Sequence, residues 1–414
     1  MENVKGLQCI SCGRVFPADD RVFTCPECGE KGILDVIYDY DYIKKNISRE
    51  TLSQNRDYSI WRYLPFLPVQ KESRRTPLKV GWTPLYYPQK LMEVLGLSRL
   101  FLKDDGLNPT ASLKDRASAI AVVKAGEEGF ETVACSSTGN AASSLAGNAA
   151  AMGLKSVIFV PQRAPQGKVA QLLIFGATVI SVQGNYEDAF HLSAQAIAHW
   201  GWYNRNAAIN PYLVEGKKTV TLEICEQLNW QVPDWAIFSV GDGCTIAGAW
   251  KGFKDLYQAG FIDKLPKMAG VQAEGCCPIT RAFLSGNPLE PMEENTLADS
   301  IAVGVPRNPD KALNAIRESK GTMINVTDEE ILQAMKLLGH TCGVFGEPAG
   351  VTGLAGLKKL VAGGLISRDE LVVTCITGNG LKDVNNAVKA AGAPIKVDPD
   401  LGELKKKLAG LVRF

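Results

Sequence analysis

Short runs of β-branched and apolar residues alternate with longer amphipathic stretches from about Leu78 onward, and no other feature of the sequence constrains the fold as much. The pattern predicts six strands, over Thr132–Cys135, Ser156–Val160, Thr178–Val182, Ala236–Val240, Met268–Val271 and Leu371–Ile376. Helices are expected over Ala141–Met152, Lys168–Phe175, Tyr186–His199, Gly216–Leu228, Ile246–Ala259 and Glu329–Leu338. Regular alternation of this kind is typical of βαβ units around a mostly parallel sheet, so the sequence predicts an α/β protein.

The size and charge of the chain limit the classes of function. At 414 residues the chain is long enough for two or three domains. Its net charge of +1 gives no reason to expect a nucleic acid or an anionic membrane as a partner. No apolar run is long enough to cross a bilayer, and the first residues lack the apolar stretch of a signal peptide. A cytoplasmic protein is therefore expected.

Two Cys-x-x-Cys pairs lie near the start of the chain, formed by Cys9, Cys12, Cys25 and Cys28, with twelve residues between the pairs. Each pair places two thiolates on one side of a tight turn, and two such turns complete a tetrahedral sulfur shell suited to zinc. A segment as small as residues 1–35 could not fold on its apolar core alone, so the metal would stabilise it. Four unrelated thiols are the alternative. Because four protein ligands leave no open position, the predicted site is structural.

Lys114 lies in the segment Asn108–Arg116, a polar turn that leads into the apolar pattern Ala117–Val123. Ser112 is the expected N-cap of a helix, which would put Lys114 in the first helical turn. There the helix dipole disfavours an ammonium group and lowers its pKa, and a lysine that forms a Schiff base needs a lowered pKa. An ordinary surface lysine in a helix is the alternative.

Two further loops each join a predicted strand to a predicted helix. Hydroxyls and amides of Ser136–Ala141 could bind a carboxylate, with Asn140 free to reach a cofactor oxygen, although a plain N-cap loop remains an alternative. In Val240–Ile246, Gly241 and Gly243 let successive backbone amides converge on a phosphate. This loop lacks both the Gly-Lys-Ser/Thr of a Walker loop and the GxGxxG spacing. Three such loops at the carboxyl ends of parallel strands indicate one shared binding cleft.

In combination and in order, the motifs of the chain resemble those of the threonine synthase family, which has the tryptophan-synthase-β-like fold (fold type II) and uses pyridoxal 5′-phosphate. The resemblance rests on LNPTASLKDRAS, ACSSTGNAASSLA, INPYLVEGKKT, SVGDGCTIAGAWKGF and TCITGNGLKD. It extends over nearly the whole chain and includes the cysteine-rich start and YSIWRYLPFLPV. The family uses an amino acid as substrate, and the resemblance implies a homodimer.

The resemblance also implies roles for individual residues. Lys114 would carry the cofactor and act as the general base, and Asn140 would bond the 3′-oxygen of the cofactor. Thr377 would face the pyridine nitrogen. The cofactor phosphate would be bound by Gly241, Asp242, Gly243, Cys244 and Thr245. The substrate would be held by Ser137, Thr138 and Gly139, together with Lys103.

Three positions depart from the family pattern for binding the phosphate of O-phosphohomoserine. A threonine, a serine and an arginine of the family are replaced here by Ala141, Ala208 and Leu213. Loss of an arginine leaves a phosphate dianion poorly compensated, because charge-assisted bonds are the strong ones. Lys103 and Lys217 are nearby cations that could compensate in part.

Three hypotheses about function follow. The first is threonine synthase activity, in which O-phosphohomoserine and water give threonine and phosphate. The second is a paralogue that catalyses β- or γ-elimination or replacement on a different, non-phosphorylated amino acid. The third is a non-catalytic zinc-ribbon interaction protein. The first two predict the same architecture, with a zinc ribbon at residues 1–35, a large cofactor-binding domain at 36–130 and 211–414, and a smaller mobile domain at 131–210.

Overall fold

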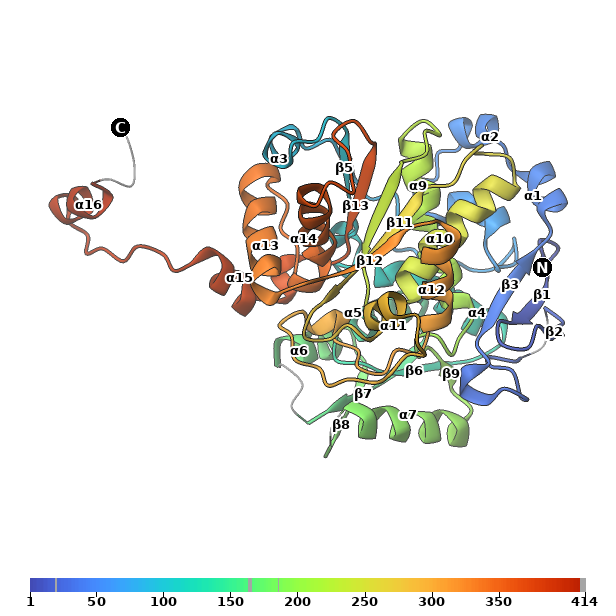
Figure 1. Ribbon diagram of the computed structural model, residues 1–414. Coiled ribbons are helices and arrows are strands. Elements are labelled where there is room, and N and C mark those ends of the chain that lie inside the picture. Colours follow the sequence, from blue (N-terminus) through green and yellow to red (C-terminus); the bar gives the residue numbers. More distant parts are fainter. Residues whose placement is uncertain (19–20, 163–165, 185, 410–414) are drawn as a thin grey trace.

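The computed structural model describes residues 1–18, 21–162, 166–184 and 186–409, and its strands form three separate sheets (Figure 1). A three-stranded sheet comes first in the chain, and sheets of six and four strands follow. The six-stranded sheet lies in the middle of the molecule in Figure 1, with the four-stranded sheet below it. The α/β fold class predicted from the sequence is confirmed.

The first sheet is antiparallel and carries both cysteine turns. It contains β1 (Val4–Cys9), β2 (Val15–Phe16) and β3 (Leu34–Tyr38), with β1 in the centre. This sheet is fixed to the rest of the protein through β3, because the Lys251 ammonium donates to the Val36 carbonyl at 2.7 Å. Two short helices follow, α1 (Tyr40–Asn46) and α2 (Arg49–Gln54).

The six-stranded sheet has the order β12-β11-β10-β13-β5-β4. Its neighbouring strands are parallel except β4, which runs antiparallel to β5 at the edge. In chain order, its strands are β4 (Leu85–Tyr86), β5 (Leu100–Asp104), β10 (Trp235–Ser239), β11 (Lys267–Ala273), β12 (Thr322–Val326) and β13 (Val372–Ile376). Strand β10 is buried along its whole length, as expected for a central parallel strand with helices on both faces.

Helices cover both faces of this sheet and enclose two hydrophobic clusters. Successive residues of a strand point to opposite faces, so Ile237 belongs to one cluster and its neighbour Phe238 to the other. The cluster around Ile237 includes residues of α3 (Gln89–Leu95), α13 (Asp328–Cys342) and α14 (Pro348–Ala362). The other cluster includes residues of α4 (Lys114–Glu127), α8 (Tyr212–Lys217), α9 (Thr219–Gln227), α10 (Cys244–Gln258), α11 (Pro278–Ser285) and α12 (Pro309–Glu318).

The four-stranded sheet is parallel and has the order β8-β7-β6-β9. Its strands are β6 (Thr132–Ser136), β7 (Lys155–Pro161), β8 (Thr178–Val182) and β9 (Tyr203–Asn204). They are connected through α5 (Asn140–Met152), α6 (Gln166–Ile174) and α7 (Tyr186–Trp200). All these elements fall inside residues 131–210, for which a smaller domain is predicted; its boundaries and its mobility stay predictions.

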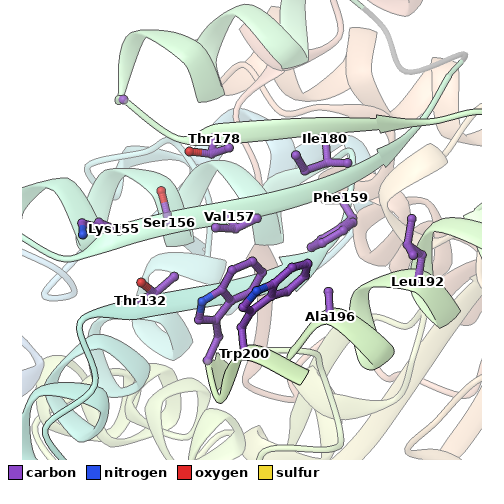
Figure 2. A pocket seen from close by; sticks show the side chains of 12 residues that line it. Thr132, Lys155, Ser156, Val157, Phe159, Thr178, Ile180, Leu192, Ala196 and Trp200 are labelled. Atoms are coloured by element: carbon purple, nitrogen blue, oxygen red, sulfur yellow. The ribbon is translucent and has the colours of Figure 1, made fainter. Parts of the chain in front are cut away.

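An apolar hollow of about 530 Å³ lies between α7 and the four-stranded sheet (Figure 2). Phe159 of β7 and Leu192 of α7 line it. So do Trp200 and Trp202, whose rings stack with centroids 4.9 Å apart. Because Lys114 and the glycine loop do not line this hollow, it is separate from the predicted cleft.

All six predicted strands are present, but β5 and β12 were not predicted, nor were the short strands β4 and β9 or the first sheet, β1–β3. Strands β5 and β12 are both five residues long, and β5 ends with the charged pair Lys103-Asp104, which hides the strand pattern. The predicted N-cap at Ser112 is wrong. Helix α4 begins at Lys114 with Leu113 in the cap position and no side-chain cap bond, so Lys114 lies at its first residue.

The last helices, α15 (Val384–Ala391) and α16 (Leu401–Leu408), contain no buried residue. Helix α15 packs at the edge of the body through Ala387 and Ala390, whereas α16 lies away from the body in Figure 1. Short 3-10 helices complete the description, at Gly29–Lys31, Ile60–Phe66, Asp105–Leu107, Asp299–Ile301 and Gly380–Lys382. Among the described residues, none of the helices is both long enough and apolar enough to cross a membrane.

Candidate active site

The loops singled out in the sequence converge on one cavity of about 140 Å³. They meet there because each follows a parallel strand or opens a helix: β6 ends at Ser136, β10 at Ser239 and β13 at Ile376. Of the predicted cofactor residues, the cavity is lined by Lys114, Asn140, Gly241, Asp242, Gly243, Cys244, Thr245 and Thr377. It is also lined by Ala141, Arg205, Ala207, Lys217, Ser239, Val240, Ser300, Ile301, Val303, Glu347 and Ala349.

Lys114 has the lowered pKa that was predicted from its position in the helix. Burial is the largest cause, and the charges of Lys217 and Arg205 lower the pKa further, to about 8. The charge on Asp242 acts in the opposite direction. Burial therefore does more than the helix dipole on which the prediction relied. A lysine with this pKa is in part a neutral amine near neutral pH, and the neutral amine is the nucleophilic and basic form.

Asn140 is held in place by an acidic residue that the sequence analysis did not identify. Its amide Nδ2 donates to Glu347 Oε1 at 2.5 Å, and both side chains are almost fully buried. Glu347 occupies the N-cap position of α14, and its backbone N–H donates to the Gly378 carbonyl at 3.0 Å. A Cβ atom at position 378 would lie 2.1 Å from Glu347 Oε1, so a glycine is required there. Glu347 thus joins the Asn140 helix to the turn after Thr377.

The glycine loop leaves no room for side chains at Gly241 and Gly243. A Cβ atom on Gly241 would lie 2.9 Å from the Ile301 Cα atom. Gly243 has φ of +89°, and a Cβ atom there would lie 2.5 Å from the Asn308 carbonyl oxygen. The loop ends at α10, where the first amides of a 15-residue helix have no partner inside the helix. This end of the cavity therefore offers several N–H donors and a favourable helix dipole to an anion.

The donors that line this cavity fit pyridoxal 5′-phosphate. A phosphate matches the amides and dipole at the start of α10, and an aldehyde matches the amine of Lys114. The buried amide of Asn140 is available to a ring oxygen, and Thr377 adds a neutral hydroxyl. The Asp242 side chain instead fixes a neighbouring loop. Its Oδ1 accepts a hydrogen bond from the Arg307 backbone N–H at 2.6 Å, and the Asp242 carbonyl accepts one from the Asn308 backbone N–H at 3.1 Å.

A second cavity of about 370 Å³ adjoins the first, because Lys114, Asn140 and Ala141 line both. Ser137, Thr138 and Gly139 line the second cavity, so the predicted substrate loop lies beside the predicted cofactor site. Gly139 donates its backbone N–H to Ser137 Oγ at 3.1 Å, which closes a tight turn before α5.

The family model described as "Pyridoxal-phosphate dependent enzyme" matches residues 76–378. The threonine synthase of Methanocaldococcus jannaschii is 45% identical over 407 residues, which are 98% of this chain and 99% of that protein. The threonine synthase of Methanosarcina acetivorans is 44% identical over 407 residues, which are 98% of each chain. This chain belongs to the threonine synthase family of pyridoxal-phosphate-dependent enzymes.

Solved structures support the fold. The structure of the processed form of threonine deaminase isoform 2 from Solanum lycopersicum matches with a TM-score of 0.63 at 22% identity, over 75% of this chain and 88% of that one. Maize serine racemase matches with a TM-score of 0.64 at 22% identity, over 79% and 91% of the two chains. The predicted family, fold and enzyme class are therefore confirmed, and the hypothesis of a non-catalytic interaction protein is wrong.

The structure places Lys103 outside both cavities, so its predicted contact with the substrate is wrong. Its side chain is fully buried and lies 2.7 Å from Glu223 Oε2. It also donates to the Thr83 carbonyl and to Gln227 Oε1, both at 2.8 Å. Proximity of Lys103 to Lys114 in sequence did not imply proximity in space, because β5 carries the Lys103 side chain away from the cleft.

Of the three positions that depart from the threonine synthase pattern, only Ala141 lines the cleft. Ala208 packs in a small cluster with Ile33 and Cys244, with φ of +67°, and its neighbour Ala207 lines the cavity instead. Leu213 is fully buried in the large hydrophobic cluster. The three changes therefore do not line one pocket, and the close full-length relatives favour threonine synthase over the proposed paralogue.

Arg205, Ser300 and Glu347 line the cavity but were not predicted to belong to the site. Pro348 is the first residue of α14, and a proline at this position is typical of a helix start. It could have indicated that the preceding residue, Glu347, is the N-cap. Arg205 directly follows β9, a strand of two residues that is too short to recognise in the sequence. No local signal marks Ser300.

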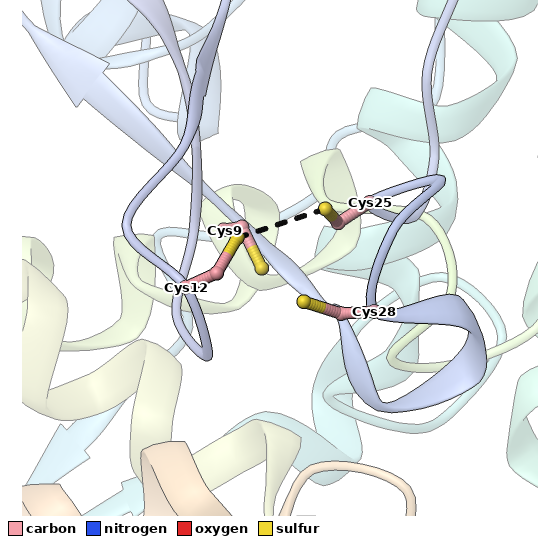
Figure 3. A group of neighbouring side chains, drawn as sticks. All are labelled: Cys9, Cys12, Cys25 and Cys28. Atoms are coloured by element: carbon pink, nitrogen blue, oxygen red, sulfur yellow. Dashed lines mark hydrogen bonds between the residues drawn. The ribbon is translucent and has the colours of Figure 1, made fainter.

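The four cysteines near the start of the chain come together as predicted. Their sulfur atoms all lie within 4.8 Å of one another, and Figure 3 shows them directed toward a common centre. Cys12 Sγ and Cys25 Sγ are 3.8 Å apart. All eleven cysteines of the chain are free thiols.

Proposed function

We propose that this protein converts O-phosphohomoserine and water to threonine and phosphate. The observation that carries the proposal is a partly buried lysine with a lowered pKa in the shared cleft, in a chain that matches threonine synthases over 98% of its length. Pyridoxal 5′-phosphate would supply the electron sink that allows the C–H bonds at Cα and Cβ, and then the C–O bond at Cγ, to break. The protein determines which of these bonds reacts.

Each residue of the cleft has a role in this proposal. Lys114 holds the cofactor and, once its Nζ is free, takes the proton from Cα of the amino acid and carries protons at the later carbons. Asn140 donates to the 3′-oxygen. Thr377, which lines the cavity, would place a neutral hydroxyl toward the pyridine nitrogen, and a neutral partner would not favour protonation of that nitrogen. The amides from Gly241 to Thr245 would hold the phosphate of the cofactor.

The substrate carboxylate is held by the loop from Ser137 to Gly139, with the amides at the start of α5 as donors. This loop belongs to the four-stranded sheet, whereas Lys114 opens a helix packed on the six-stranded sheet. Closure of residues 131–210 on the large domain would bring the two together and exclude water until phosphate has left. Water then adds at Cβ.

Zinc is proposed as the ion bound by the four cysteines. Zinc–sulfur bonds of about 2.3 Å in a tetrahedron separate the sulfur atoms by about 3.8 Å. The spacing of 3.8 Å between Cys12 and Cys25 agrees with that value. One equivalent of zinc by elemental analysis of the purified protein, lost in a Cys12→Ser variant, is expected; absence of zinc from the wild type would contradict the proposal.

Location and assembly complete the proposal. None of the eleven cysteines forms a disulfide, which suits a reducing compartment, so a cytoplasmic location is proposed. A homodimer is proposed because large apolar side chains stay exposed near the C-terminal helices, among them Leu381, Val384 and Val388. Light scattering after size exclusion should give about twice the chain mass of 44.7 kDa.

The deciding experiment is turnover of O-phosphohomoserine by the holoenzyme. Threonine and phosphate should appear in equal amounts, at an ordinary enzyme rate on the order of 1–1,000 per second. The control is the same protein after removal of the cofactor, which should be inactive. Absence of threonine with intact, cofactor-loaded protein would exclude the proposed activity.

A further inference from the structure

Two cations besides Lys114 lie in the cleft, and both are buried. Arg205 directly follows β9 and is 1% exposed. Lys217 is the last residue of α8 and is 2% exposed. Both line the cavity of about 140 Å³ together with Lys114. Each of the two lowers the pKa of Lys114, which shows that the three charges act on the same space.

Neither of these cations has a carboxylate partner among the described residues. The guanidinium of Arg205 donates to Ser118 Oγ, from Nε at 3.2 Å and from Nη2 at 3.1 Å. Ser118 is a neutral hydroxyl that also bonds Ser144. Lys217 forms no ion pair with any residue in the described part of the chain. Burial is the largest cause that lowers the pKa of both side chains, and the charge of Arg205 lowers that of Lys217 further. The charge of Asp242, which lines the same cavity without pairing with either cation, raises the pKa of Lys217.

A buried charge without a counter-charge is costly, and mutual repulsion adds to the cost. An anion that enters the cavity lowers this free-energy cost, because it attracts both cations. Charge-assisted bonds from arginine and lysine are the strong ones for phosphate, and arginine can bind two of its oxygens at once. The pair is therefore suited to a phosphate dianion.

The position of Arg205 indicates which phosphate is bound. The amides at the start of α10 already serve the cofactor phosphate in the proposed function. Arg205 also lines a small adjoining cavity of about 70 Å³, together with Ser137 and Ala141 of the substrate loop. Arg205 therefore lines both the space beside the substrate loop and the space beside the glycine loop. The methyl group of Ala141 leaves space there for a bulky group.

We propose that Arg205 and Lys217 form the subsite for the phosphate of the substrate, and this proposal rests on the proposed function. When the Cγ–O bond breaks, its electron pair stays on the departing phosphate oxygen and the negative charge of that group increases. Two fixed cations at this position stabilise the increased charge. They also retain inorganic phosphate as a product until the cleft opens.

The experiment uses the holoenzyme, with inorganic phosphate as the probe, and the variants Arg205→Met and Lys217→Met. Each variant should weaken phosphate binding by about 10- to 100-fold, measured by calorimetry and by inhibition, because a charged hydrogen bond is lost. KM for O-phosphohomoserine should rise by a similar factor. The affinity for the cofactor, measured by absorbance titration of the apoprotein, should change by less than about twofold.

Two further variants serve as controls. Lys254→Met removes an exposed cation on α10 that pairs with Glu318, and it should leave all three quantities unchanged. Arg205→Lys keeps the charge, so it should retain most of the phosphate affinity and should fold even if Arg205→Met does not.

Unchanged phosphate binding in folded Arg205 and Lys217 variants would overturn the proposal. So would a loss of cofactor affinity with phosphate binding intact, since the cations would then serve the cofactor. If the wild type binds phosphate through these residues but does not convert O-phosphohomoserine, the anion subsite stands and the proposed function fails.

Discussion

Two groups of buried cations in this protein differ in how their charges are compensated. Arg116 lies 2.7 Å from Asp105 and 2.5 Å from Glu223, and all three side chains are fully buried. In the cleft, Arg205 and Lys217 are buried to nearly the same degree without a carboxylate partner among the described residues. Equal burial therefore does not mean an equal role: the paired group is a structural cluster, whereas the unpaired group is the one proposed to bind anions.

The strongest test of this difference is Lys114→Ala. Activity should fall by at least about 1,000-fold, because both the cofactor link and the general base are lost. The free energy of unfolding of the apoprotein should stay the same or increase, since a partly buried charge that Lys217 and Arg205 repel is removed. Steady-state turnover and urea denaturation measure the two effects. A large loss of stability would show that Lys114 belongs to the structural group.

Glu223→Gln should have the opposite profile. It leaves Arg116 and Lys103 with one carboxylate fewer in a fully buried cluster, so unfolding should become easier by about 3–5 kcal/mol. Urea denaturation of the apoprotein measures this loss. Turnover per folded molecule should be nearly unchanged, because Glu223 does not line the cleft. Unchanged stability would contradict the assigned role of the pair.

The pH dependence of stability is a second test of the role of Glu223. Burial raises its pKa, but the charges of Arg116 and Lys103 outweigh burial and lower it to about 2. A carboxyl group with a lowered folded-state pKa contributes stability above its unfolded pKa, and this contribution is lost as the pH falls toward 2. The wild type should therefore lose more stability than Glu223→Gln in urea denaturation between about pH 5 and pH 2.

Lys114 should show a pH dependence centred far from that of Glu223. Its amine must be neutral to attack the cofactor aldehyde, and its pKa is lowered to about 8. The rate at which the apoprotein binds pyridoxal phosphate covalently should rise about tenfold per pH unit below pH 8 and level off above it. Stopped-flow absorbance measures this rate. A midpoint near the ordinary lysine pKa would show that burial and the neighbouring cations do not act on Lys114 as described.

The smallest expected effect concerns the acidic residue of the cleft. Glu347→Gln keeps the shape but replaces a charge-assisted bond to Asn140 with a neutral one, so turnover should fall by about fivefold. The absorbance spectrum of the bound cofactor should shift, because Asn140 contacts its ring oxygen in the proposed site. An Asn46→Asp change on α1, remote from the cleft, is the matched control. An unchanged spectrum would assign Glu347 to the structural group instead.

Local patterns in the sequence were sufficient to predict much of the fold and most of the loops that line the cleft. Glycine-rich turns after β6 and β10 predicted the loops that meet Lys114, because carboxyl ends of parallel strands share one edge of a sheet. The Ser112 cap failed because hydrogen bonding at a helix start depends on the exact path of the preceding turn. Lys103 and Leu213 were misplaced because nearness in sequence does not give the direction of a side chain.

The sequence by itself therefore determined the alternation of strands and helices, the place of Lys114 at a helix start and the convergence of the four cysteines, since each depends on residue spacing within a short segment. Tertiary structure alone decided how buried charges are compensated. Glu223 reaches Arg116 across 107 residues, and Glu347 reaches Asn140 across 207. Arg205 and Lys217 meet Lys114 only after separate segments pack together. Burial and electrostatic pairing are properties of packed surfaces, and no short stretch of sequence contains them.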